Sequence, residues 1–410
     1  MKVSFRQRAY SIFFRFSPLL IVVLLELGLR LWGIGDSYLL FSTSSDKQYY
    51  ELNHLYYRRF VAAEQFNDIP ILPQRFPVKK SNNTRRIFLI GDQSLCSYFP
   101  DANTKQILPD FYDSDSLYYD IIQIAVPYTN SFAMVRLVKC LNRYDADGYV
   151  VVSGANEFYG IPRKSKWMED IDNYWGLTAY VTLKNHRFLQ ILERFVYLKK
   201  DSHTEFPPAD IDEWAVPYQS DLYLEAESYF ERNLKRMIKK AEKPLFLVSL
   251  PENIKIRPYR SFFDDKELQD ADIAQECAVL VDNADRFTID RWINDLKAWE
   301  PQTAIYYHCL AKINEHEGQT EEALKNYARA LDLDVFRVRS NAHFNDLIDM
   351  YSGMYGKGLI DVRGSMLNAT SKGLYIDRYF SNGLAFNNRG KKQFTDKIKE
   401  SLTHYFQSPK

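Results

Sequence analysis

Short runs of consecutive apolar residues recur from residue 86 onward and alternate with segments of helical periodicity. The apolar runs are RIFLIG (86–91), DIIQIAV (120–126), GYVVVSG (148–154), PLFLVSLP (244–251) and GLIDV (358–362). Strands that are apolar throughout bury both faces, as in a parallel sheet covered by helices. Residues 131–144 and 229–243 have helical periodicity and precede two of these runs. The alternation predicts an α/β fold with a doubly wound, parallel, five-stranded sheet.

Two longer segments interrupt this alternation. Residues 160–228 are rich in Trp, Tyr and Pro, and we expect them to form a cap or side wall of the α/β domain. Trp167, Tyr174 and Trp175 make this insertion a candidate contact surface, because aromatic side chains are enriched at interfaces. The alternative is a cap that packs on its own domain. Residues 252–357 form the second insertion, which we expect to be mainly helical.

Residues 303–334, within the second insertion, have the spacing of one tetratricopeptide unit. Small side chains at Ala311 and Ala323 would let two helices approach closely, and Gly318 would form the turn between them. A single unit cannot bury its own apolar face, so it must pack on the main domain or on a partner. The alternative is an ordinary helical hairpin with no role in ligand binding.

The first 35 residues combine a basic leader (1–16) with an apolar run (17–35) of about the length that a bilayer crossing needs. Glu26 and Arg30 interrupt the run, but they lie four residues apart on one helix face and can pair. No A-x-A-like cleavage site follows. We therefore predict an uncleaved, single-pass transmembrane helix with the leader in the cytoplasm. A buried core helix is the alternative.

This topology predicts a protein of the bacterial inner membrane. Residues 36–85 would form a linker or helical neck, and the remaining chain would lie in the periplasm or outside the cell. The membrane itself and protein subunits of an envelope complex are the expected partners.

The 410-residue chain has equal numbers of cationic and anionic side chains, 53 Lys and Arg against 53 Asp and Glu. Without a basic excess or a Lys/Arg stripe paired with aromatic residues, nucleic-acid binding is not expected. Its cysteines have no C-x-x-C spacing, so we expect buried thiols and no zinc site, other metal or cofactor. The cysteines are Cys96, Cys140, Cys277 and Cys309.

The motifs, taken in order over residues 86–400, resemble the SGNH, or GDSL, hydrolase family. RIFLIGDQS is similar to the family's first block and IIQIAVPYTNS to its second. YDADGYVVVSGANEFYG is similar to the third block, and FSNGLAFNNRG to the last. The leader, the segment LPENIKIRPYRS and the tetratricopeptide-like hairpin resemble a membrane-anchored branch of that family. The resemblance implies a flavodoxin-like sandwich.

In that family a serine follows the Gly-Asp of the first block and attacks an ester carbonyl, and an Asp and a His of the last block complete the triad. Here the nucleophile position falls on Gln93, the acid position on Asn382 and the base position on Ala385. None of these three side chains can take its role. Ser94 follows the nucleophile position by one residue and could act as the nucleophile only if the turn shifted. The seven histidines suggest no replacement base, and each is expected to be a polar surface residue.

The oxyanion donors of the family are a glycine N–H in the second block and an asparagine side chain in the third. These positions fall on Ala125, whose N–H could still donate, and on Asn156. Structural roles are the alternative for two polar residues of these blocks. Asn156 could bond loop backbone at a strand end, and Asp92 could cap the helix after the first strand.

Two functions from different classes follow. The favoured hypothesis is a membrane-anchored, catalytically inactive SGNH-like protein that acts as a structural or assembly subunit, or that binds a glycan or protein. The alternative is a working esterase or O-acyl transferase on envelope polysaccharide or lipid, with Ser94 as its nucleophile.

Overall fold

The structure is a computed structural model. It describes residues 5–60, 71–160, 174–197, 215–259, 303–339, 342–355, 358–370, 374–381 and 383–407, together with Thr288, Arg291 and Asn294. Its contacts divide the chain into two compact units. One unit comprises Met1–Ile69 and Lys164–Phe206, and the other comprises Pro70–Arg163 and Pro207–Lys410.

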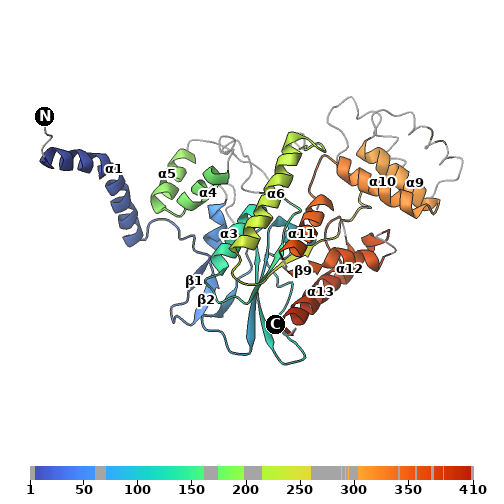
Figure 1. The fold of residues 1–410 in the computed structure, drawn as a ribbon, viewed down its shortest axis with the longest axis horizontal. Helices are drawn as coiled ribbons and strands as arrows, with labels where there is room; N and C mark the ends of the chain where they lie inside the picture. Colours follow the sequence, from blue (N-terminus) through green and yellow to red (C-terminus); the bar gives the residue numbers. More distant parts are fainter. Residues whose placement is uncertain are drawn as a thin grey trace. The chain divides into compact units, whose positions relative to one another are not determined.

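The second unit is built on a six-stranded sheet (Figure 1). Its strands are β4 (Thr84–Gly91), β5 (Phe111–Tyr112), β6 (Tyr118–Ala125), β7 (Gly148–Val152), β8 (Leu245–Ser249) and β9 (Gly358–Asp361). The spatial order is β5-β6-β4-β7-β8-β9, and the five longer strands are parallel. These five strands are the five predicted apolar runs. Their order, 2-1-3-4-5 in chain sequence, is that of a flavodoxin-like doubly wound fold.

The sixth strand corrects the predicted count of five. β5 pairs antiparallel with β6 at the edge of the sheet, with Phe111 opposite Tyr119 and Tyr112 opposite Tyr118. The rings of Phe111 and Tyr119 stack with centroids 4.4 Å apart. A two-residue edge strand is too short to produce an alternating or continuous apolar pattern, so the sequence gives no signal for it.

The helices around this sheet fall into two groups. One buried cluster joins the sheet to α2 (Gln93–Tyr98), α12 (Val362–Asn368) and α13 (Asn388–Gln407), through residues such as Leu95 and Phe394. The second group comprises α3 (Ser131–Leu141), α6 (Asp221–Lys240) and α11 (Ala342–Met354). The rings of Phe230 on α6 and Phe344 on α11 lie 4.8 Å apart. The short strand β3 (Arg75–Pro77) precedes the sheet in the chain.

The predicted hairpin is present as α9 (Ala304–His316) and α10 (Thr320–Leu333) (Figure 1). Gly318 lies in the turn between them with φ +75°, a left-handed conformation that favours glycine. Ala311 and Ala323 have no exposed surface and share one cluster with Tyr327 and Leu374. Because Leu374 lies outside the hairpin, this contact packs the helix pair on its own unit.

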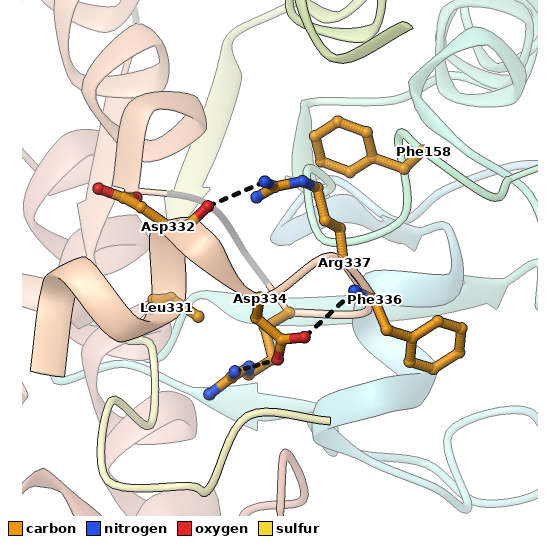
Figure 2. Close-up of a pocket in the computed structure, with 7 residues that line it drawn as sticks. Phe158, Leu331, Asp332, Asp334, Phe336 and Arg337 are labelled. Carbon is orange, nitrogen blue, oxygen red and sulfur yellow. Dashed lines mark hydrogen bonds and ion pairs between the residues drawn. The ribbon is translucent and has the colours of Figure 1, made fainter. Parts of the chain in front are cut away.

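Two buried arginines hold the loop that follows α10 through hydrogen bonds and an ion pair (Figure 2). Arg337 donates from Nε to the carbonyl of Val216 at 2.7 Å and from Nη2 to that of Asp332 at 2.8 Å. Arg339 forms an ion pair of 2.5 Å with Asp334, and both side chains are almost completely buried. The pocket at this junction has a volume of about 20 Å³, room for about one water molecule. The network therefore holds the hairpin in place and leaves no space for a larger ligand.

The first unit contains α1 (Phe5–Leu31), β1 (Phe41–Thr43), β2 (Tyr49–Leu52), the 3₁₀ helix η1 (His54–Arg59), α4 (Tyr174–Leu183) and α5 (Arg187–Tyr197). β1 and β2 pair antiparallel. Within residues 36–85, expected as a linker or helical neck, the described part (36–60 and 71–85) contains short strands and one short 3₁₀ helix. Residues 164–206 of the aromatic insertion belong to this unit, and residues 207–228 belong to the other.

The pairing of Glu26 with Arg30 is confirmed, with Arg30 Nε 2.7 Å from Glu26 Oε1. Glu26 also accepts a hydrogen bond from the N–H of Phe188, and Arg187 donates to the carbonyl of Leu29 at 3.1 Å. These contacts join the end of α1 to the start of α5. The expected transmembrane helix over residues 17–35 was not found: no helix among the described residues is both long and apolar enough to cross a membrane.

Candidate functional site

The predicted site lies at the carboxyl ends of β4, β6 and β7, where doubly wound folds place their ligands. β4 ends at Gly91, and a Cβ there would lie 2.3 Å from Cβ of Leu95, so only glycine fits this turn. Asp92 follows and accepts a hydrogen bond from the N–H of Ser94 at 2.7 Å. This contact confirms that Asp92 caps the N-terminus of α2.

Gln93, at the nucleophile position, is tied to the second block. Its Oε1 accepts a hydrogen bond from the N–H of Tyr128 at 2.8 Å, and its own N–H donates to the carbonyl of Thr129 at 3.3 Å. Tyr128 has φ +61°, a conformation that is strained for a residue with a side chain. The Gln93 amide therefore helps to hold an unfavourable loop conformation, which is a structural role.

Ser94, the fallback nucleophile, has no exposed surface. Its Oγ accepts a hydrogen bond from the N–H of Ala155 at 2.8 Å, and its hydroxyl is also bonded to the carboxyl of Asp92. Both contacts lie inside the protein, and neither partner is a histidine. A serine in this setting stabilises the turn after β4 and has no path to a substrate.

Asn156, at the oxyanion position, is also bonded within the protein. Its Nδ2 donates to the carbonyl of Thr129 at 3.0 Å, and its carbonyl accepts from the N–H of Gly160 at 2.7 Å. The Thr129 carbonyl thus accepts from both Gln93 and Asn156. The structural alternative, in which Asn156 bonds loop backbone at a strand end, agrees with this geometry.

Ala125 is the last residue of β6 and lies opposite Gly91 in the sheet. It is almost fully buried, with 3% of its surface exposed. The next N–H, that of Val126, donates to the carbonyl of Gly91 at 2.8 Å. The structure therefore places Ala125 beside the first block, as expected for the family's second block.

The last block forms a hydrogen-bonded loop, but it has alanine at the position of the catalytic base. Ala385 accepts from the N–H of Ser381 at 2.8 Å, whereas Asn382 lies outside the described residues. The side chain of Asn387 donates to the carbonyl of Phe380 at 3.0 Å and accepts from the N–H of Gly390 at 3.0 Å. These bonds of Asn387 hold the turn that precedes the closing helix α13.

Asp92 and Glu157, which follow β4 and β7, form a pair of buried carboxyl groups that was not recognised from the sequence. Ser153 donates to Asp92 Oδ2, and Glu157 accepts from the N–H of Ser131 at 2.9 Å and from its hydroxyl at 2.6 Å. Burial, followed by the charge of Asp92, raises the pKa of Glu157 well above its usual value. Burial also raises the pKa of Asp92, against the hydrogen bonds from Ser153 and Ser94. The available signal was the proximity of Ser153 and Glu157 to the end of β7.

None of the six histidines among the described residues supplies a base for Ser94. His54, His186, His316, His343 and His404 are exposed, as expected, and His203 lies outside the described residues. The expectation was wrong for His308, which is 2% exposed and packs edge-on against the Tyr327 ring at 5.5 Å. Burial lowers the pKa of His308 to about 3, so this residue is neutral at neutral pH and belongs to the hairpin core.

The proposed aromatic contact surface is described at one of its three residues. Trp175, on α4, is 78% exposed. Trp167 and the side chain of Tyr174 lie outside the described part of the structure. Among the described residues no cluster of His, Cys, Asp and Glu could hold a metal ion. Cys96 is a buried thiol, and within the described ranges it forms no disulfide.

Comparisons with known proteins found no match to a family model and none to a curated protein. Two solved structures are similar to the chain. One is a lipase/acylhydrolase from Enterococcus faecalis, with 11% identity and a TM-score of 0.35, covering 80% of this chain and 98% of its own. The other is described as a GDSL-like lipase from Parabacteroides merdae, with 11% identity and a TM-score of 0.32, covering 78% of this chain and 95% of its own.

The description of the second structure names GDSL, the family that the ordered sequence blocks resemble. Such low identities and scores carry nothing about activity, substrate or residue roles. The candidate site is therefore assessed from its own geometry.

Proposed function

We propose that this chain is a non-catalytic SGNH hydrolase-like protein that binds a ligand or a partner and does not hydrolyse esters. The observation that carries the proposal is the Thr129 carbonyl. It accepts hydrogen bonds from the N–H of Gln93 and from Nδ2 of Asn156. Oxyanion donors must be free and aimed at developing negative charge, and the Asn156 side chain is here already bonded to a carbonyl of the chain itself.

The side chains at the triad positions support the same proposal. Gln93 cannot attack a carbonyl and Ala385 cannot accept a proton, so no nucleophile–base pair exists at these positions. The esterase alternative requires Ser94 to reach a substrate. Its complete burial and its bonds to Asp92 and Ala155 argue against that alternative.

The test is hydrolysis of short acyl esters and of acetylated sugars by the purified full-length protein. We expect no release of acid above the buffer rate, because catalysis needs a nucleophile, a base and free oxyanion donors together. If hydrolysis occurs, Ser94→Ala decides its origin. Activity that disappears in this variant would establish Ser94 as the nucleophile and overturn the proposal.

A restoration variant provides a sharper comparison. Gln93→Ser, Asn382→Asp and Ala385→His together reintroduce the three reacting side chains. We expect at most feeble hydrolysis, because the Thr129 carbonyl still accepts the Asn156 amide and catalytic geometry must be held within about 0.5 Å. Turnover at hundreds of times the buffer rate would contradict the account of an occupied site.

A further inference from the structure

A second pocket of the sheet-containing unit lies between the hairpin and the 3₁₀ helix that precedes the last block. Its volume is about 540 Å³, within the range of about 300–1,000 Å³ that is usual for small-molecule sites. Its walls come from the segment after β8, from α9 and α10, and from the 3₁₀ helix η6 (Ile376–Tyr379). It does not include Gln93, Ser94 or Asn156, so it is separate from the site described above.

Asn253 gives this pocket an unsatisfied acceptor. Its side chain is only 6% exposed, and Nδ2 donates to the carbonyl of Gly383 at 3.2 Å. Oδ1 of the same amide is buried and has no hydrogen-bond partner among the residues that the structure describes. A buried acceptor left without a donor is costly, by about 1–3 kcal/mol. A ligand hydroxyl in the pocket would supply the missing donor.

The charged groups of the pocket are balanced and held in place. Lys255 Nζ lies 2.5 Å from Glu315 Oε1 and 3.9 Å from Asp377 Oδ1, and Lys312 adds a second cation to the lining. Two cations thus face two anions. A ligand with strong net charge would meet a like charge here, whereas a hydroxyl group can accept from an ammonium and donate to a carboxylate.

We propose that this pocket, beside the hairpin and the last-block loop, binds a neutral, hydroxyl-rich ligand such as a short oligosaccharide. Among the described lining residues Ile256 alone is aliphatic, which disfavours a lipid chain. The inference rests on the proposed binding role and names its ligand class. It assigns the hairpin a function as one wall of the site, with Glu315 and Lys312 contributed by α9.

The experiment is calorimetric titration of the full-length protein with maltotriose, cellotriose and the trisaccharide of N-acetylglucosamine. We expect at least one of them to bind with a Kd below about 10 mM. Asn253→Ala and Lys312→Met should each weaken that binding at least about 10-fold, because each removes one polar partner of a hydroxyl. Lys325→Met, a change at a side chain that is 69% exposed on α10, is the matched control and should bind as the wild type does.

Thermal melting of each variant establishes that it folds. If Asn253→Ala releases the Gly383 loop and unfolds, Lys312→Met alone decides. Binding of none of the three trisaccharides would overturn the proposal, as would equal binding by the wild type and Lys312→Met. Preference for glucose 6-phosphate over all three would overturn the neutral ligand class. None of these results depends on ester hydrolysis. The ligand assignment can therefore be wrong while the absence of catalysis holds, and the reverse is also possible.

Discussion

Gln93 lies at the position where the family that the sequence resembles has its nucleophile, and its amide instead bonds the loop backbone. A serine hydroxyl at this position could not reach as far as a glutamine amide, which bonds the N–H of Tyr128 across the loop. The neighbouring Ser94 and Asp92 bond each other. Polar groups that would attend a substrate in a hydrolase therefore satisfy the protein's own backbone here.

Glu157 leads to a prediction about pH. Its pKa is raised by burial and by the charge of Asp92, so the folded protein holds a proton that the unfolded chain releases above about pH 4.5. The stabilisation from this group is complete at lower pH and is lost as the pH rises through the raised pKa. We expect the free energy of unfolding in urea to fall with rising pH, by up to about 1.4 kcal/mol per pH unit for one proton.

The matched variants are Glu157→Gln and Glu400→Gln. Glutamine keeps the size of Glu157 without its charge, so Glu157→Gln should flatten the pH dependence and unfold at higher urea than the wild type at alkaline pH. Glu400 lies on α13 with 68% of its side chain exposed, so Glu400→Gln should leave the pH dependence of unfolding unchanged. An unaltered slope in Glu157→Gln would show that this carboxyl is ionised in the folded protein.

Secondary-structure elements were predictable in proportion to their length and burial. The five parallel strands are each four or more residues long, and all but β9 are mostly buried, so their apolar runs were recognisable. The edge strand β5 has only two residues and was missed. The hairpin was recognisable because a glycine at φ +75° and two fully buried alanines each tolerate few alternatives.

The hairpin also carries a prediction of stability. Ala323→Leu adds a branched side chain where Ala323 has no exposed surface and shares a cluster with Ala311, Tyr327 and Leu374. Overpacking of this kind costs about 1–3 kcal/mol. We expect the melting temperature to fall, with Ala328→Leu on the exposed side of α10 as the control. Equal melting temperatures for the two variants would mean that the helices do not approach closely.

At the scale of the whole molecule, the parallel sheet of five long strands followed from the apolar runs, but the contacts of the site did not. Bonds such as that of Asn156 with Thr129 join residues 27 positions apart, and their geometry depends on loops that no periodic pattern specifies. Asn382 and Trp167, outside the described residues, stay predictions from the sequence alone. The division of the aromatic insertion between two units was likewise beyond any local pattern.

Localisation also stays a prediction, based on the basic leader and on an apolar run in which residues such as Leu20, Ile21 and Leu24 are exposed. We expect alkaline phosphatase fused to the C-terminus to be active, because this reporter folds only after export. Green fluorescent protein fused at the same point should be dark after transport in unfolded form. The opposite pair of signals would place the C-terminal part in the cytoplasm.

The Thr129 carbonyl would also make a loss of catalysis difficult to reverse in evolution. A return to serine at Gln93 alone would remove the amide oxygen that holds Tyr128 in its strained conformation, and would create no base at Ala385. Each single reverse substitution would weaken the fold before any activity appeared. The hydrogen bond between the Thr129 carbonyl and the Asn156 side chain would still have to break. Under the proposed function, these backbone contacts would oppose a return to catalysis in such a lineage, even if an ester substrate became available again.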